Sequence, residues 1–362
     1  MPSRERVLVI RHRAAGDLLL TTPAFRALRE GRPGASIEVL AARGMEGLLL
    51  GNPDVDRVLT FDRRSIVSQA RLYARLARGG YDLVLDLVSN PRSAFLTALT
   101  RARDRVGYDI AGRAWAYTLR VPREPLDDAG KPRLRYAPEA ALDLVRAIGI
   151  APRGVELRFT VTPEARASIA PWLDRAAQEA GGKPLVACLP VGSWPSKSWF
   201  PERFAQTMDL LADEACPVWI WGPGEEAAVA AVRAHMTRPS LLAPATNWQG
   251  LGALLERTAL LVGNDSGPKH VAVALGVPTV TIFGPTHPTT WHPPRGPHAV
   301  VEAMGLECLH CNANVCPLEG ERHWRCMRDV TPERVAAVSR GLLASARGTG
   351  QGPAKEATCA NR

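Results

Sequence analysis

Residues 262–286 constrain the fold of this chain more than any other segment. Two flanking stretches, Leu260–Val262 and Val277–Phe283, are apolar, rich in β-branched residues and bounded by Gly or Pro. Such stretches are typical of buried parallel strands. The polar, glycine-containing residues 265–267 can cap a short helix between them and let a ligand approach the backbone. The segment therefore predicts a β-α-β unit whose helix N-terminus is suited to bind phosphate.

Length and composition indicate two soluble domains. A chain of 362 residues is long for one hydrophobic core, and its 46% hydrophobic and 22% charged residues are typical of globular proteins. No segment approaches the about 18 consecutive apolar residues needed to cross a bilayer, and the N-terminus lacks the pattern of a signal peptide. We therefore expect a cytoplasmic protein.

The net charge of +9 favours anionic partners without identifying one. Nucleic acid, an anionic membrane surface and a phosphorylated glycolipid fit this charge equally well. Nearly all of the basic excess is arginine, and a merely solvated basic surface is the alternative.

Strand and helix patterns alternate along the chain, which predicts an α/β fold in both halves. In the first half we expect strands at Arg6–Ile10, Ile37–Leu40 and Leu83–Val88, helices at Ser65–Ala77 and Ala140–Ile148, and a surface loop at Pro122–Pro138. In the second half we expect strands at Leu185–Leu189 and Val218–Trp221, with a helix from Pro201 between them. We place domains at residues 1–165 and 183–330, a final helix at 331–347 and a disordered tail at 348–362.

Three further segments, in a fixed order with residues 262–286, carry a resemblance to a known family. They are Arg6–Arg29, Lys197–Phe204 and Gly222–Glu225. With these motifs the chain resembles glycosyltransferase family 9, whose best-known members are the ADP-heptose:lipopolysaccharide heptosyltransferases of Gram-negative bacteria. The resemblance implies two Rossmann-like doubly wound domains that face a central cleft, the GT-B type. It implies an acceptor-binding N-terminal domain, a C-terminal domain that binds the nucleotide sugar, and a final helix that packs back on the N-terminal domain.

Asp17 is the candidate catalytic residue. It follows Gly16 just beyond the first predicted strand, so its carboxylate is expected at the ligand-binding edge of the sheet. Transfer of a sugar to a hydroxyl needs a base that removes the acceptor proton, and a carboxylate can do this. From the residues alone, a turn or capping aspartate is the alternative. The resemblance implies that Asp17 is the base.

Ser193, Lys197 and Glu225 are the first candidates for the donor site. The resemblance implies that Lys197 contacts the donor phosphates, where a compact ammonium can neutralise the charge of a departing diphosphate. Glu225 follows a Gly-rich turn and can accept hydrogen bonds from ribose hydroxyls. Glu226 could take that role instead, and a first-turn glutamate that favours the helix dipole is the structural alternative.

The resemblance also implies that the nucleotide diphosphate binds in the segment that constrains the fold. Its expected ligands there are Asp265, Ser266, Gly267, His270 and Thr286. Lys269 departs from the apolar residue usual in the family at that position, and it could reach either the diphosphate or solvent.

Arginines of the first domain are candidates for the acceptor. Arg11, Arg13, Arg63 and Arg64 could pair with phosphates or sugar-acid carboxylates. The basic charge could also hold the enzyme at the inner face of the cytoplasmic membrane without insertion.

Four cysteines close to one another in the sequence suggest a structural zinc site. They are Cys308, Cys311, Cys316 and Cys326. In a cytoplasmic protein, zinc explains such a group better than disulfides do. Buried reduced cysteines are the alternative.

Together these features predict an inverting, metal-independent transferase. We expect it to move a heptose from ADP-heptose to the lipid A-core glycolipid, in the inner core of lipopolysaccharide, and we expect no nucleic-acid partner. One alternative is a family 9 enzyme with another nucleotide sugar or acceptor. The other is a non-catalytic protein that binds a nucleotide sugar or nucleic acid.

Overall fold

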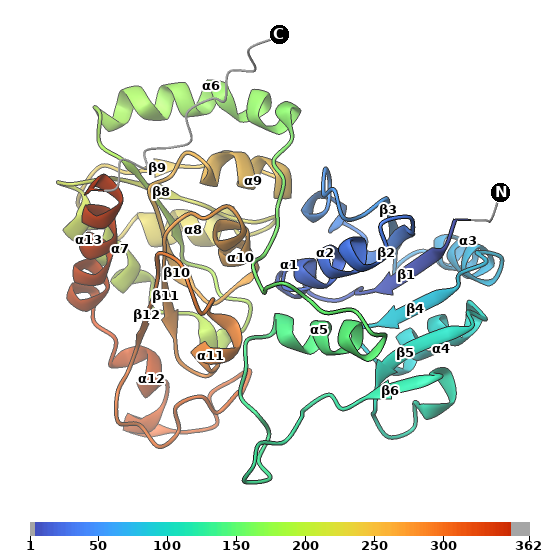
Figure 1. Cartoon of the computed structure of the whole chain (residues 1–362). Coiled ribbons are helices and arrows are strands. Elements are labelled where there is room, and N and C mark those ends of the chain that lie inside the picture. The colour runs from blue at the N-terminus through green and yellow to red at the C-terminus, as the bar shows by residue number, and fades with distance from the viewer. Residues whose placement is uncertain (1–3, 349–362) are drawn as a thin grey trace. The chain divides into compact units, whose positions relative to one another are not determined.

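The computed structural model describes residues 4–348, which form two compact units (Figure 1). The chain divides after Thr160, so the helix α6 (Pro163–Ala180) belongs to the second unit. The expected domain ranges, 1–165 and 183–330, leave most of this helix between the two domains. It packs on α9 (Trp248–Leu255), and this contact assigns it to the second unit. The tail expected at 348–362 lies outside the described residues except for Gly348, which ends the last helix.

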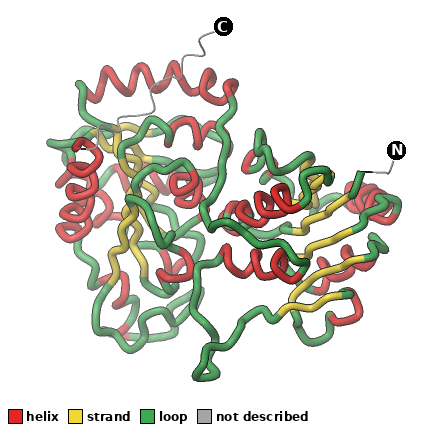
Figure 2. Tube along the Cα trace, viewed as in Figure 1, coloured by secondary structure: helices red, strands yellow, loops and turns green. Residues whose placement is uncertain are grey.

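The first unit is a parallel sheet with helices between its strands (Figure 1). Its strands are β1 (Arg6–Ile10), β2 (Ser36–Ala42), β3 (Arg57–Phe61), β4 (Leu83–Asp86), β5 (Asp104–Tyr108) and β6 (Leu119–Val121). Its α-helices are α1 (Ala15–Leu19), α2 (Thr22–Gly31), α3 (Ile66–Ala77), α4 (Pro91–Leu99) and α5 (Pro138–Ala147). The predicted strand at residues 6–10 and the helix near residues 65–77 are confirmed. Residues 122–137 form the expected loop, which contains one isolated bridge (Figure 2).

The second unit repeats this plan. Its strands are β7 (Leu185–Leu189), β8 (Cys216–Trp219), β9 (Leu241–Leu242), β10 (Leu260–Asn264), β11 (Thr279–Phe283) and β12 (His298–Glu302). Its remaining α-helices are α7 (Pro201–Leu211), α8 (Glu226–Arg233), α10 (Gly267–Ala274), α11 (Pro288–Trp291), α12 (Arg325–Arg328) and α13 (Pro332–Gly348). The β-α-β unit expected at residues 262–286 is formed by β10, α10 and β11.

Both sheets have the doubly wound strand order, in which the chain starts at a central strand, runs to one edge, returns to the centre and runs to the other edge. It is β3-β2-β1-β4-β5-β6 in the first unit and β12-β11-β10-β7-β8-β9 in the second, with parallel pairing throughout. In each sheet the order reverses between two central strands, β1 and β4 or β7 and β10. Ligands of doubly wound sheets bind outside the carboxyl ends of strands at such a reversal. The topology therefore points to the segments after β1 and β4, and to those after β7 and β10.

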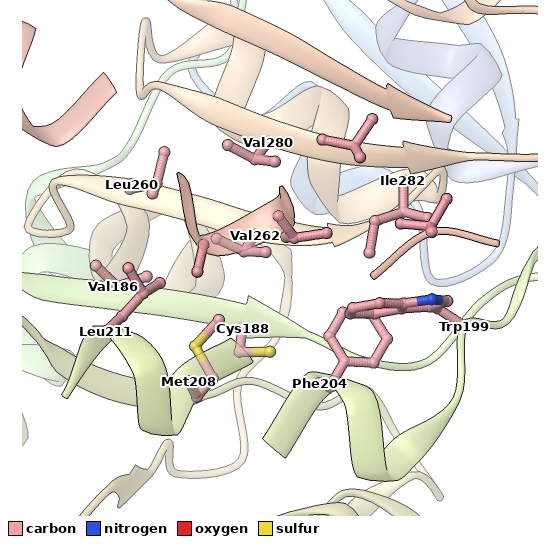
Figure 3. Packing of buried hydrophobic residues seen from close by; sticks show 14 of the residues in the cluster. Val186, Cys188, Trp199, Phe204, Met208, Leu211, Leu260, Val262, Val280 and Ile282 are labelled. Carbon is pink, nitrogen blue, oxygen red and sulfur yellow. The ribbon is translucent and has the colours of Figure 1, made fainter. Parts of the chain in front are cut away.

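The core of the second unit fixes these strand ends. Strands β7, β10 and β11 direct Val186, Val262 and Val280 toward one face of the sheet, where α7 packs (Figure 3). Trp199 and Phe204 meet edge to face there, with ring centroids 5.0 Å apart. Alternate residues of a strand point to opposite faces, so a strand buried on both faces reads as a continuous apolar run.

The last helix, α13, packs on α7 and on the sheet of the second unit. Its expected packing on the N-terminal domain stays a prediction. Its residues Val335, Ala336 and Leu343 are buried in that unit's hydrophobic core. These apolar residues recur at helical spacing on one face, and burying that face stabilises the helix in this position. None of the helices in residues 4–348 is long and apolar enough to span a membrane.

Candidate functional site

Asp17 lies in the first turn of the short helix α1, just after the carboxyl end of β1. Ala14, which precedes this helix, has a positive φ of 49°, a conformation that turns the chain sharply away from the strand. The hydroxyl of Thr21 donates to the carbonyl oxygen of Asp17 at 2.8 Å and ties α1 to the start of α2. The side chain of Asp17 stays 26% exposed. A carboxylate at a strand end with access to solvent is suited to take up a proton from a substrate.

Arg11 holds the carboxylate of Asp17. One guanidinium nitrogen lies 2.9 Å from Asp17 Oδ2, and another donates to the carbonyl oxygen of Leu87 at 2.6 Å. Leu87 directly follows β4, the strand beside β1 at the reversal of strand order. Two of its nitrogens thus have partners, whereas Nε is buried without one in the described structure, and the predicted contact of Arg11 with the acceptor stays a prediction. The arrangement makes it a residue that orients Asp17.

Three of the arginines predicted to bind the acceptor, Arg13, Arg63 and Arg64, line one cavity. The cavity has a volume of about 540 Å³ and lies entirely in the first unit. Arg43 lies there too and is paired with Asp62 at 2.6 Å. Within residues 4–348, no carboxylate lies within ion-pair distance of the three predicted arginines. Their charges therefore remain available to an anionic ligand.

His12 also lines this cavity, and the sequence reasoning missed it. Its ring is 1% exposed, and neither ring nitrogen has a hydrogen-bond partner in the described structure. Burial and the nearby charges of Arg63 and Arg92 lower the pKa of His12 to about 4. The ring is therefore neutral near pH 7 and offers one donor and one acceptor. Its place directly after Arg11 was the only sequence signal.

Asp265 is the centre of the second site. Its Oδ2 accepts hydrogen bonds from Lys197 at 2.8 Å and from Thr286 at 3.0 Å, and its Oδ1 accepts from Lys269 at 2.6 Å. Burial by itself would raise the pKa of this carboxyl. The positive charges of Lys269 and Lys197 outweigh burial and hold the pKa well below its usual range. The structure thus brings together Lys197, Asp265 and Thr286, as predicted, and adds Lys269.

Ser266 and His270 carry unused polar groups at the start of α10. Ser266 is the N-cap residue, and its buried Oγ has no partner in the described structure; the same holds for Nδ1 of His270. Burial lowers the pKa of His270 well below its ordinary value, and Lys269 lowers it further, so the ring is neutral. A helix N-terminus that begins at Gly267 adds unpaired backbone N–H groups. Together these groups can bind an anion.

Lys197 is positioned by a short helical turn and by aromatic rings. It ends the turn η3 (Pro195–Lys197), which follows β7. Its Nζ lies 4.4 Å from the ring centroid of Trp194 and 5.7 Å from that of Trp291. Asn264 fixes the same region because its side chain joins β10 to the backbone of Pro190 and Trp199. Asn264, Trp194 and Trp291 were not predicted, because their partners are distant in the sequence.

Ser193 and Glu225 are the two predicted donor residues that the structure leaves apart from this cluster. Ser193 is exposed on the loop after β7. The carboxylate of Glu225 accepts a hydrogen bond from the backbone N–H of Gly222 at 2.8 Å, within its own turn. This contact stabilises the turn before α8, and the role of Glu225 toward the ribose stays a prediction.

The four cysteines predicted to bind zinc lie near one another, and the zinc site stays a prediction. Within residues 4–348, no three His, Cys, Asp or Glu side chains are grouped closely enough to hold a metal ion. The four cysteines are neighbours. Burial raises the pKa of Cys326 to about 11, and the three other thiols nearby contribute to this rise. Cys316 accepts a hydrogen bond from the backbone of Trp324, and Cys311 is exposed.

Comparison with known proteins gives a consistent result. Residues 69–321 match the model of glycosyltransferase family 9 (heptosyltransferase). Lipopolysaccharide heptosyltransferase 3 of Escherichia coli is 26% identical over 291 residues, which cover 77% of this chain and 83% of that protein. Lipooligosaccharide heptosyltransferase 2 of Haemophilus ducreyi is 24% identical over 94% of this chain and 99% of its own length.

Solved structures show the same fold. A family 9 glycosyltransferase from Veillonella parvula has a TM-score of 0.80 at 23% identity and covers 94% of this chain and 97% of its own. The ADP-heptose lipopolysaccharide heptosyltransferase II of E. coli has a TM-score of 0.76 at 21% identity, with 94% of this chain and 99% of its own covered. The predicted fold class, two Rossmann-like doubly wound domains of the GT-B type, is confirmed.

Proposed function

Because the chain belongs to glycosyltransferase family 9, the heptosyltransferase family, we propose that it transfers a heptose from ADP-heptose to the inner core of lipopolysaccharide with inversion. In this reaction the acceptor hydroxyl oxygen attacks the anomeric carbon, and its proton passes to the carboxylate of Asp17. The bond between the anomeric carbon and the diphosphate breaks, and ADP leaves. A single displacement of this kind inverts the configuration at the anomeric carbon.

The observation that carries the proposal is the cation cluster on Asp265. Two lysines and a helix N-terminus with unpaired polar groups occupy the carboxyl ends of β7 and β10. Negative charge develops on a departing diphosphate, and fixed positive charges that are shielded from water stabilise it strongly. We propose that Lys197 supplies this stabilisation and that the reaction needs no metal. E. coli heptosyltransferase WaaC has been solved with ADP and with ADP-2-deoxy-2-fluoro heptose, which supports this choice of donor.

The arginine-lined cavity of the first unit supports a charged acceptor. Arg13, Arg63 and Arg64 would pair with phosphates or sugar-acid carboxylates of the glycolipid core. Neutral His12 would supply a hydrogen bond at the buried end of the same cavity.

Exposed apolar residues beside these arginines support contact with an anionic membrane. Ile66 and Val67 begin α3 and are 84% and 60% exposed. Arg63 and Arg64 directly precede them. Apolar side chains next to basic ones suit the interface of an anionic bilayer. We expect the wild type to sediment with anionic vesicles, and Ile66→Asp/Val67→Asp to sediment less while it transfers to a water-soluble acceptor normally.

The function is tested with purified protein and a set of donors. The wild type should be stabilised against thermal unfolding by ADP and ADP-heptose, and should transfer heptose to a deacylated core acceptor. An NMR spectrum of the product should show the anomeric configuration opposite to that of the donor. Stabilisation by UDP-sugars and not by ADP-sugars would overturn the donor, and retention of configuration would overturn the single displacement. Tight duplex binding with a steep salt dependence, without transfer, would favour a nucleic-acid-binding protein instead.

A further inference from the structure

Lys269 is a buried ammonium whose N–H groups a ligand cannot reach. Its side chain is 0% exposed. Its Nζ donates to Asp265 Oδ1 at 2.6 Å and to the carbonyl oxygen of Trp291 at 2.8 Å, and lies 5.0 Å from the ring centroid of Phe283. Two of its three N–H groups are hydrogen-bonded to oxygens, and the side chain has no exposed surface through which a ligand could reach the third. Lys269 therefore does not contact a phosphate itself.

Lys197 shares the same carboxylate but donates to one oxygen only in the described structure, so it keeps N–H groups that no oxygen accepts. Asp265 Oδ2 lies 2.8 Å from its Nζ, and its other close neighbours are the faces of Trp194 and Trp291. In the described part of the chain, Asp265 is the only acidic partner of either lysine. Two ammonium groups on one carboxylate give a formal charge of +1.

This charge lies where water is largely excluded. The side chain of Lys197 is 10% exposed and that of Asp265 is 4% exposed. A buried unpaired charge is unfavourable unless a partner neutralises it, and the attraction of an anion is strong at low dielectric. Ser266 Oγ and His270 Nδ1, at the start of α10, are buried without a hydrogen-bond partner in the described structure and can bond to a ligand there.

We propose that Lys269 is a positioning residue that pairs with Asp265 and so leaves the charge of Lys197 available to the phosphates of the donor. The inference rests on the proposed donor site. Without the Lys269 ammonium, Asp265 would pair with Lys197 alone, and the cluster would be formally neutral. A diphosphate would then compete with Asp265 for Lys197. Lys269 thus acts on the ligand through Asp265, which explains why a fully buried lysine belongs to an anion site.

The test measures the affinity of ADP and of inorganic pyrophosphate by titration calorimetry. Lys269→Gln keeps groups that can hydrogen-bond to Asp265 and Trp291 but removes the charge, and Lys269→Met matches the length of the side chain. We expect both variants to bind the two probes about tenfold more weakly. In Lys269→Met/Asp265→Asn, the carboxylate and its counter-ion are both absent, so Lys197 again carries the unpaired charge. We expect its affinity to return to within about threefold of the wild type.

Thermal unfolding without ligand separates this effect from a structural one. A purely structural lysine would lower the unfolding temperature and leave the affinity of the folded variants unchanged, which would overturn the inference. So would a folded double variant that binds no better than Lys269→Met. If the wild type binds pyrophosphate but prefers another nucleotide, the ADP assignment fails and the pyrophosphate series still decides the role of Lys269. If the wild type binds neither probe, both proposals are wrong.

Discussion

Two aspartates, each beside the reversal of strand order in its own unit, have opposite surroundings. Asp17 follows β1 and Asp265 follows β10, each at the start of a helix and beside the reversal of strand order. Asp17 is 26% exposed and has a single arginine partner, whereas Asp265 is 4% exposed and accepts from three side chains. Strand ends beside the reversal of strand order thus support two different chemical roles.

The difference follows from the number of lone pairs that remain free. A general base needs an oxygen that can approach the substrate proton, and Asp17 keeps such access. Asp265 has its oxygens occupied by Lys197, Lys269 and Thr286, so it organises cations rather than accepting a proton. Nearby positive charge that holds the pKa of Asp265 low keeps it anionic for that purpose. Four predictions test this contrast.

The largest effect is expected for Asp17→Asn. The amide has nearly the same shape but cannot accept the proton, so the rate of transfer should fall by about 10²- to 10⁴-fold. The dissociation constant of ADP should change by less than about twofold, because the donor site keeps all its groups. Rates from a coupled ADP-release assay and affinities from calorimetry check this. Transfer at the wild-type rate would show that Asp17 is not the base.

Asp265→Ala should chiefly affect stability. It leaves two buried ammonium groups without their carboxylate, and breaking a buried ion pair from one side costs about 3–5 kcal/mol of unfolding free energy. The matched control is Asp17→Ala, which removes a partly exposed partner of one arginine and should cost about 1 kcal/mol or less. Urea unfolding followed by tryptophan fluorescence compares the two. Equal losses would contradict the contrast between the sites.

The burial of His12 should make the unfolding free energy depend on pH. Its pKa is about 4 in the folded protein against 6.5 ordinarily. Between these values the unfolded chain takes up a proton that the folded chain refuses, so stability falls as the pH drops from 6.5 to 4. His12→Leu should remove about 2 kcal/mol of this loss. Unfolding free energies of both proteins over this range provide the check, and parallel curves would mean that His12 titrates normally.

The smallest effect is expected for Arg11→Lys. The guanidinium bridges Asp17 and the carbonyl oxygen of Leu87 with separate nitrogens, which one ammonium cannot reproduce in the same geometry. We expect kcat to fall about threefold in Arg11→Lys and about tenfold in Arg11→Met, with ADP affinity unchanged. A rise in the KM for the acceptor at constant kcat would show instead that Arg11 binds the acceptor.

The sequence predicted the central strands better than the outer ones. The ranges expected for β1 and β7 coincide with the observed strands, because central parallel strands are buried on both faces and read as continuous apolar runs. The outermost strands β3, β6, β9 and β12 were not predicted. Three of them contain intermediate or exposed positions at most residues, and β9 has only two residues, so their patterns are weak.

The candidate site divides in the same way. The motifs and their order singled out Asp17, Lys197, Asp265 and Thr286 as candidates. The spacing of four residues between Asp265 and Lys269 also suits an ion pair at the start of a helix, and we did not use it. The zinc prediction stays a prediction: the four cysteines are neighbours, and within residues 4–348 no three possible ligands are grouped as a metal site.

The sequence by itself determined the two doubly wound domains, since apolar runs and polar turns are local patterns that fix where buried strands and ligand-facing loops occur. Only the tertiary structure decided that the carboxylate of Asp17 is accessible to solvent and that the carboxylate of Asp265 accepts hydrogen bonds from three side chains. Lys197 and Thr286 lie 68 and 21 residues from Asp265 in the sequence. Arg11 and Leu87 lie 76 residues apart and follow two strands, β1 and β4, that are neighbours in the sheet. The reactivity of a carboxylate depends on how many donors surround it, and packing brings these donors together from distant parts of the chain.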